Sequence, residues 1–171
     1  MRPTGLLVAG ALALAVAAGG CGSSDDPEQP KPSTVDIAHG GSATVGSLRI
    51  SGAYVPQPAS PATAAAYFTI RNDGDSADAL KQISTPISSM AMLHRYRPTG
   101  PGTEEMTGVM ELKLPPHKTI QLRPGQLHVM IENPQASLKK GDVVALTLVF
   151  AHAGKVTLQA PVTAIGRGPQ G

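Results

Sequence analysis

This sequence lacks tryptophan altogether and contains a single cysteine, Cys21, among its 171 residues. One cysteine cannot form a disulfide within the chain. Because Cys21 lies near the N-terminus, a thiolate-ligated metal centre or a cysteine nucleophile in the main domain is also excluded, and so is the His₂Cys core of a blue-copper site. Aromatic residues are few, with three Tyr and two Phe. The core must therefore consist largely of Val, Ile, Leu and Ala.

The sequence also contains no long run of residues with the same charge. The chain has 14 Lys+Arg and 12 Asp+Glu, a formal net charge of +2. Loss of Arg2 with a cleaved N-terminal signal would leave 13 against 12, or about +1. Nucleic acid is therefore not an expected partner, because it is usually bound by clustered Lys and Arg. The length fits one domain of ordinary size, which we expect to be monomeric.

The first 20 residues have the pattern of an export signal. Arg2 precedes an apolar run from Leu6 to Ala18, and the small residues 18–20 lead directly into Cys21. The run is shorter than the about 20 apolar residues that a membrane-spanning helix needs. We predict a lipoprotein signal peptide over 1–20, a lipid on Cys21 and a location on the extracytoplasmic face of a bacterial cell membrane. The alternative is an ordinary secretory signal with an incidental cysteine.

The rest of the chain divides into a tether, one domain and a short tail. Residues 21–42 begin with a polar, Pro-rich stretch that cannot bury apolar surface, and they are predicted to be a disordered tether. Residues 43–165 alternate short β-rich runs with Gly, Pro and Asn turn signals, which favours an all-β fold, an antiparallel β-sandwich. Residues 166–171 are predicted to be a flexible tail. The expected strands are 44–55, 64–72, 90–96, 109–114, 119–122, 127–131, 143–150 and 156–162.

Two imidazoles and two thioethers form the most informative pattern in the domain. His128 and Met130 are two residues apart in a predicted strand, so their side chains project to the same face. Met106 lies upstream with 21 residues between it and His128, and His94 lies upstream of Met106 with 11 between. Thioether sulfur is a soft, neutral ligand, whereas Mg²⁺ and Ca²⁺ prefer oxygen. A mixed His/Met set therefore favours copper, and Cu(I) in particular.

Other residues are weaker candidates for metal binding. Met92 shares a strand face with His94, and Met110 follows Met106, but methionine also fills gaps in cores. His39, at the junction of tether and domain, is either solvated or an auxiliary ligand of a second, weaker Cu(II). His117 and His152 lie in turns and are predicted to be exposed. The sequence contains no nucleophile elbow, phosphate-binding loop or His-Glu-x-x-His motif, so we do not expect an enzyme.

The same residues resemble the signature of the PCuAC family of bacterial periplasmic copper chaperones, His-x₁₀-Met-x₂₁-His-x-Met. Here it reads His94-x₁₁-Met106-x₂₁-His128-x-Met130, with one extra residue that falls in a Pro/Gly-rich loop. The segments 66–75, 122–130 and 138–150 also resemble family segments. The departures are Tyr54 in place of a usual Trp and Gln126 in place of a second Gly. The extra residue leaves Met110 as the alternative to Met106.

The resemblance implies a cupredoxin-like β-sandwich of Greek-key type that carries one Cu(I) near its surface. It also implies delivery of copper to a membrane-bound cuproenzyme, typically the CuA centre of cytochrome c oxidase, or to another copper chaperone. Two other functions remain open from the residues alone. One is a copper-sequestering lipoprotein that serves resistance, and the other is a cell-surface interaction module whose methionines only fill the core.

Overall fold

The computed structural model describes residues 34–36 and 39–168, and strands are the only regular elements in this part of the chain. The all-β prediction is therefore confirmed. The predicted signal, Cys21 and most of the tether lie outside the described residues. Within those residues, no helix is long and apolar enough to cross a membrane.

Most of the predicted strands occur close to their predicted bounds, and the chain forms others besides. The strands are β1 (Thr34–Asp36), β2 (Gly40–Val45), β3 (Leu48–Pro56), β4 (Thr63–Asn72), β5 (Asp78–Ser84), β6 (Met90–Gly100), β7 (Thr103–Val109), β8 (Leu112–Leu114), β9 (Thr119–Gln121), β10 (Leu127–Glu132), β11 (Val143–Phe150) and β12 (Lys155–Thr163).

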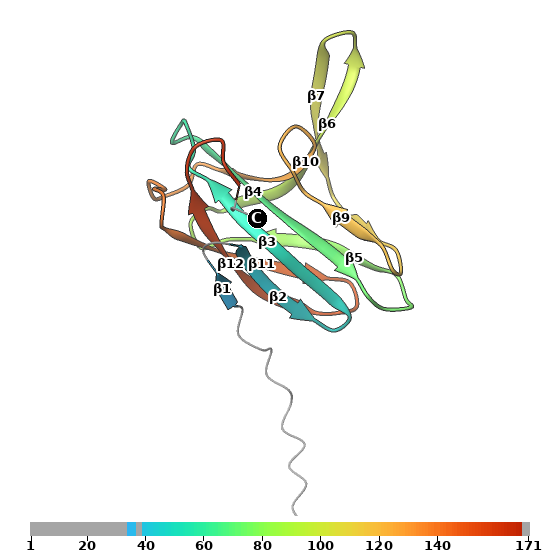
Figure 1. Ribbon diagram of the computed structural model, residues 1–171. Helices are drawn as coiled ribbons and strands as arrows, with labels where there is room; N and C mark the ends of the chain where they lie inside the picture. The colour runs from blue at the N-terminus through green and yellow to red at the C-terminus, as the bar shows by residue number, and fades with distance from the viewer. Residues whose placement is uncertain (1–33, 37–38, 169–171) are drawn as a thin grey trace, which may run out of the picture.

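The strands pair into one continuous sheet that folds over as a sandwich (Figure 1). Its order is β7-β6-β10-β4-β3-β12-β11-β5-β8, with β2 and β9 pairing at the sides of β3 and β4. Every pairing is antiparallel except that of β12 with β3, which is parallel over two residue pairs. This short parallel contact joins the layer that contains β6, β10 and β4 to the layer that contains β12, β11 and β5.

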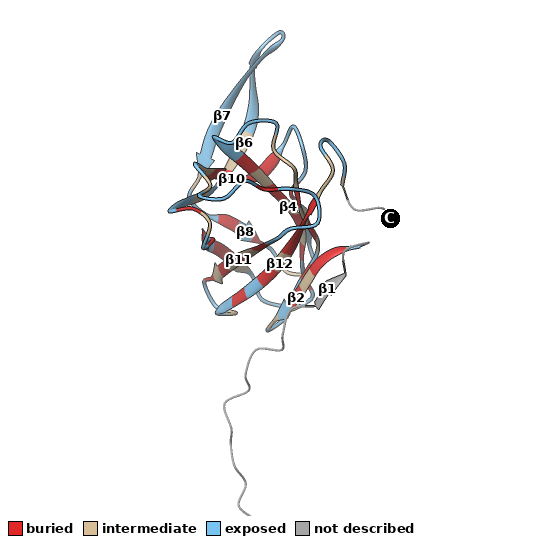
Figure 2. Ribbon diagram, turned by 90° about the vertical axis from the view of Figure 1, so that its left-hand side faces the viewer, coloured by how far each residue is buried: buried red, intermediate tan, exposed pale blue. Residues whose placement is uncertain are grey.

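The core lies between the two layers and is built by strict alternation. On β4, Ala64, Ala66, Phe68 and Ile70 are buried, whereas the residues between them are only partly covered. On β10, Val129 and Ile131 face the same core. Residues of opposite parity, such as Tyr67 and His128, therefore project from the outer face of this layer. Figure 2 shows the alternation as red and paler bands along the strands.

Four local features differ from the sequence prediction. The run 109–114 is divided, because β7 ends and β8 begins within it. The run 44–55 is two strands, because Gly46 and Ser47 form a two-residue turn between the paired Val45 and Leu48. Gly46 has φ of 54°, a left-handed conformation that glycine adopts without a Cβ clash. β5 and β7 were not predicted. β1 and β2 place part of the segment predicted as tether within the sheet, with Asp36 paired with Gly40.

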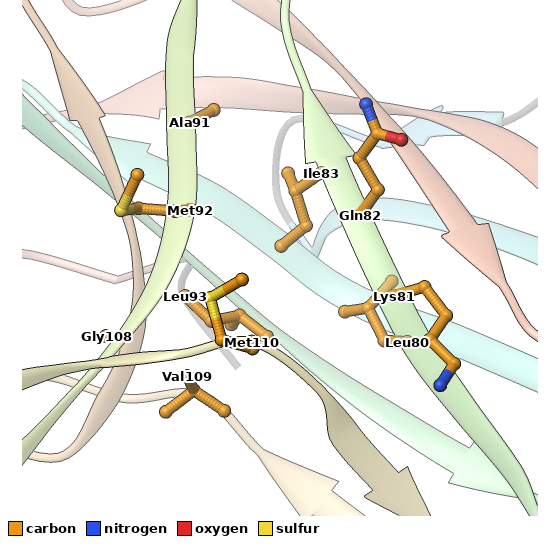
Figure 3. A pocket seen from close by; sticks show the side chains of 10 residues that line it. All are labelled: Leu80, Lys81, Gln82, Ile83, Ala91, Met92, Leu93, Gly108, Val109 and Met110. Carbon is orange, nitrogen blue, oxygen red and sulfur yellow. The ribbon is translucent and has the colours of Figure 1, made fainter.

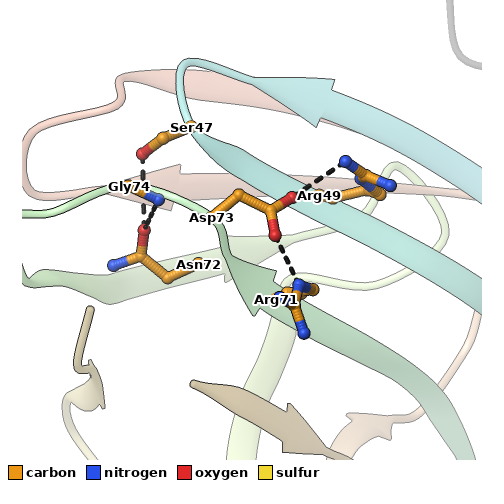
Figure 4. Close-up of polar contacts among 6 residues, drawn as sticks. All are labelled: Ser47, Arg49, Arg71, Asn72, Asp73 and Gly74. Atoms are coloured by element: carbon orange, nitrogen blue, oxygen red, sulfur yellow. Dashed lines mark hydrogen bonds and ion pairs between the residues drawn. The ribbon is translucent and has the colours of Figure 1, made fainter. Parts of the chain in front are cut away.

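A buried asparagine fixes the turn that follows β4 (Figure 4). The Asn72 amide donates to the carbonyl oxygens of Ser76 and Leu114, at 2.8 and 3.0 Å. Its own oxygen accepts from the Gly74 backbone N–H at 3.0 Å. Asp73 beside it pairs with two arginines at the surface, Arg49 and Arg71. The buried amide thus satisfies polar groups that water cannot reach, and it ties β4 to the end of β8.

The β6–β7 hairpin extends beyond the body of the sandwich (Figure 1). Its outer residues are exposed on both faces, as the pale blue arm in Figure 2 shows. The hairpin begins where Leu93 is still in the core and ends in solvent at Gly102. The site described below lies at the base of this arm, where β6 runs between β7 and β10.

Candidate metal centre

The pairing of β10 with β6 places two imidazoles directly opposite each other. His128 pairs with His94, and Met130 pairs with Met92, in one antiparallel register. Residues that are opposite in such a pair project to the same face, with Cβ atoms about 4.5–5.5 Å apart. The His94 and His128 rings have centroids 6.0 Å apart at an interplanar angle of 66°. Four of the candidate side chains therefore share one patch on the outer face of the sheet.

His128 is held in one orientation and one tautomer. Its side chain is only 4% exposed, and Nδ1 lies 3.2 Å from the backbone carbonyl oxygen of Gln126. Since a carbonyl oxygen can only accept, Nδ1 carries the proton and donates it. Nε2 is then the unprotonated nitrogen with a lone pair available to a metal ion, which is the arrangement that second-shell hydrogen bonds produce in metal sites.

Burial lowers the pKa of His128 below its ordinary value of 6.5. The Gln126 carbonyl acts in the opposite direction, because it favours the protonated ring, and the neighbouring His94 lowers the pKa further. The net direction keeps His128 neutral near pH 7, and a neutral imidazole is the form that binds metal.

One ring nitrogen of His94, Nδ1, is buried without a hydrogen-bond partner within the part of the chain that the structure describes. A buried polar nitrogen without a partner is rare in proteins and unfavourable, because the group loses its hydrogen bonds to water. A metal ion bound through Nδ1 would give this nitrogen a partner, so His94 fits a ligand.

Tyrosines enclose the imidazole pair, and sequence reasoning did not identify them. The Tyr96 ring stacks on His128 with centroids 5.3 Å apart at 28°. Tyr67 lies on the other side of His128 at 6.5 Å and contacts Tyr54 at 5.3 Å. The sequence could have identified Tyr96, because Met92, His94 and Tyr96 are each two residues apart and so share one face of a strand. These rings restrict the rotation of His128 and exclude water from its faces.

Two thioethers lie next to the imidazoles. Met130 is half-buried and follows His128 by two residues on β10, and Met92, opposite it on β6, is 40% exposed. Met92 is also two residues from His94 on the same strand face. The structure therefore brings His94, His128 and Met130 together on one face, and Met92 lies beside them.

Met106 reaches the same face from β7. It pairs with Tyr96, and Gly108, two residues on, pairs with His94. Met106 is thus the diagonal neighbour of His94, at about 7–8 Å between backbone positions, a span that a long side chain can bridge. It is 39% exposed. This position fits a flexible ligand that closes over the imidazole pair.

A bulge explains how the extra residue of the His94–Met106 spacing is absorbed. The pairing of Pro98 with Glu104 changes to that of Gly100 with Thr103, so Thr99 is an additional residue on β6. A β-bulge places one extra residue on one strand, and here the shift in register lies on the turn side of the Pro98–Glu104 pair. The pairs between the bulge and the core keep one register, so Met106 stays on the same face as His94.

The remaining candidates lie outside the immediate cluster. Met110 follows the end of β7 and is 91% exposed. His39 is exposed at the start of β2, far along the sheet order from β6. The predictions that His117 and His152 are exposed are correct. His117 Nε2 lies 3.0 Å from a carboxylate oxygen of Asp75, well away from the site.

The site is open to solvent on one side. A hollow of about 300 Å³ adjoins His128 and Met130, with Tyr67 and Tyr96 among its walls and the 56–58 loop at its rim. In the described residues, no group of three or more His, Cys, Asp or Glu could hold a metal ion. The donors at this face are thus imidazole and thioether, which suit a soft ion and not Mg²⁺, Ca²⁺ or a carboxylate-bound Zn²⁺.

We predict that the His128 imidazole of the metal-free protein titrates below 6.5 in a pH titration followed by NMR, because its charged form is desolvated. The unfolded chain takes up that proton at the ordinary pKa, so stability should fall as pH drops through about 6.5. His128→Gln should flatten this slope in denaturant unfolding. A His128 resonance that titrates at or above 6.5 contradicts the buried, neutral ring described here.

Solved structures share this fold. The apo PCuAC domain from PmoF1 is 28% identical with a TM-score of 0.60, and the match covers 72% of this chain and 98% of that one. The copper-bound PCuAC domain from PmoF2 is 25% identical, also at 0.60, with 72% and 97% covered. The Cu(I) form of DR1885 from Deinococcus radiodurans is 27% identical at 0.54, with 71% and 80% covered.

These likenesses confirm the cupredoxin-like β-sandwich. No curated protein sequence matches the chain. The profile of the LpqE-like lipoprotein family matches residues 48–162, which is most of the domain and contains every strand from β3 to β11 and almost all of β12. The chain therefore belongs to the LpqE-like lipoprotein family, and its domain is of the PCuAC type.

Proposed function

We propose that this protein is an extracytoplasmic metallochaperone that binds one Cu(I) per domain through His94, His128, Met130 and Met106. The observation that carries the proposal is the opposed imidazole pair. His128 is fixed with Nε2 available, His94 has an unpartnered buried nitrogen, and thioethers flank both. The proteins of similar structure include a copper-bound PCuAC domain and a Cu(I) form, which supports the choice of metal.

The donor set also suits a carrier that must release its metal. Neutral imidazole and thioether ligands prefer Cu(I) to Cu(II), which favours harder N and O donors in tetragonal geometry. They form weaker bonds to Cu(I) than a thiolate does, so an acceptor with cysteine ligands can take the ion. The hollow beside His128 and Met130 opens to solvent, where an acceptor can approach the ligands. A second, weaker Cu(II) with His39 as a ligand stays a prediction.

Replacement of Met106 by Leu tests the ligand set, because it removes sulfur and keeps the side-chain volume. The Cu(I) affinity of the domain should fall at least about tenfold, since even the outer-shell partners of a metal site are worth about 10- to 100-fold. Met90→Leu is the matched control, because Met90 is similarly exposed (44%) but lies at the first residue of the neighbouring strand β6, where it pairs with Glu132. A competition titration with a Cu(I) chromophore measures both.

Three outcomes would count against this assignment. A loss of affinity in Met110→Leu with none in Met106→Leu would make Met110 the ligand. A comparable loss of Cu(I) affinity in Met92→Leu alone would make Met92 the ligand in place of Met106. Absence of any Cu(I) binding by the unmodified domain would leave the non-metal interaction module as the better proposal.

We further propose that the acceptor is a membrane-bound cuproenzyme, with the CuA centre of cytochrome c oxidase as the first candidate. A strain that lacks this protein should lose oxidase activity under copper limitation and regain it when copper is added. The competing function is copper sequestration. It predicts normal oxidase activity in the deletion strain together with greater sensitivity to excess copper.

The lipid on Cys21 remains part of the proposal, supported by the lipoprotein description of the family. An anchor would hold the domain near membrane-bound acceptors and raise its effective concentration there. Cys21→Ser should move the protein from the membrane fraction to the soluble fraction while its Cu(I) stoichiometry stays at one. Retention of the variant in the membrane fraction would show that Cys21 is not the anchor.

A further inference from the structure

A row of three methionines lies beside the proposed copper site, one on β10, one on β6 and one just after the end of β7. Met130 on β10 pairs with Met92 on β6. Val109, the last residue of β7, pairs with Leu93 on β6. Met110 follows Val109, and Met92 precedes Leu93. If the antiparallel register continued by one residue, Met110 would lie across from Met92. Both residues line one hollow between β5 and the base of the hairpin; in Figure 3 the Met92 side chain extends to the side of β6 away from β5, and Met110 lies between the two strands.

The exposure of these methionines rises along the row. Met130 is half-buried, Met92 is 40% exposed and Met110 is 91% exposed. A methionine that packs in a core is normally buried, where its flexible side chain fills a gap. Met110 fills no such gap, because nearly all of its surface meets water. What it does supply at this position is an accessible soft sulfur.

The surroundings suit a soft monovalent ion. The hollow, of about 180 Å³, has walls of aliphatic residues that include Leu80, Ile83 and Leu93. Lys81 is the one charged residue on its lining, and it is paired with Glu111. No carboxylate lines the hollow, so it offers nothing to a hard cation.

Gly108 lies next to both the imidazoles and the hollow. It pairs with His94 and also lines the hollow, and a Cβ built on it would meet nothing within 4 Å. No side chain at position 108 therefore fills the space beside His94.

We propose that Met92 and Met110 form a second, weaker Cu(I) site through which copper leaves the protein. This inference rests on the proposed function. Copper stays Cu(I) throughout, and its transfer is ligand exchange. The ion gives up its bonds to the primary donors as it gains bonds to the two sulfurs, and a soft sulfur donor of the acceptor then replaces Met110 and Met92 in turn. A thiol donor releases its proton to solvent as its bond to copper forms.

The second site is tested by NMR of the protein with ¹³C-labelled methionine methyl groups during an anaerobic Cu(I) titration. The first equivalent should shift the methyl resonances of Met130 and Met106. The second equivalent should shift those of Met92 and Met110. Met110→Leu keeps the apolar volume but removes sulfur, so the first step should remain and the second should be lost. Met90→Leu, the exposed control, should keep both steps.

The exit role is tested by transfer kinetics. Protein loaded with one Cu(I) is mixed with glutathione as a soft thiol acceptor, and release is followed by the return of the metal-free methyl resonances. Met110→Leu should release copper several-fold more slowly than the unmodified protein and Met90→Leu. Equal release rates, or a second equivalent that leaves the Met110 methyl unshifted, would overturn the exit site. Failure of the first equivalent to bind would instead overturn the proposed function.

Discussion

The antiparallel pairing of β10 with β6 sets the geometry on which the rest of the site depends. It places His128 opposite His94 and Met130 opposite Met92, all on the outer face. Because side chains alternate along a strand, a slip of β10 by one residue would turn His128 and Met130 toward the core and bring Val129 out to solvent. The burial of Val129 and Leu93 in the core therefore fixes the register that assembles the metal ligands.

The same layer thus has two roles on its two faces. Its inner face holds the aliphatic core that rigidifies the strands, and its outer face carries the imidazoles, the thioethers and the tyrosines around them. Ligands on β6 and β10 are held at nearly constant separation, whereas Met106 lies on the exposed hairpin strand β7 and Met110 follows its end. A rigid pair of imidazoles with peripheral thioethers suits an ion that must be held and then given up.

The sequence predicted most of the strands in which alternation between core and outer face is complete, such as those at 64–72, 127–131 and 143–150. It did not predict β7, because Thr103–Val109 is exposed almost throughout and so has no apolar periodicity. It also merged β2 with β3, since the turn at Gly46 and Ser47 interrupts the pattern only briefly. The sequence did not place Tyr67 and Tyr96 around the imidazoles, because composition does not reveal which face of a strand a tyrosine occupies.

Chemistry and spacing along one strand were determined by the sequence itself. The scarcity of cysteine, the clustering of methionine near two histidines and the period of two that aligns His128 with Met130 are all local properties. Which donors meet was decided only by the tertiary structure. The contact of His94 with His128, the pairing of Met92 with Met130 and the bulge at Thr99 depend on strand registers between distant segments. Those registers are set by core packing and hairpin geometry, which local sequence does not encode.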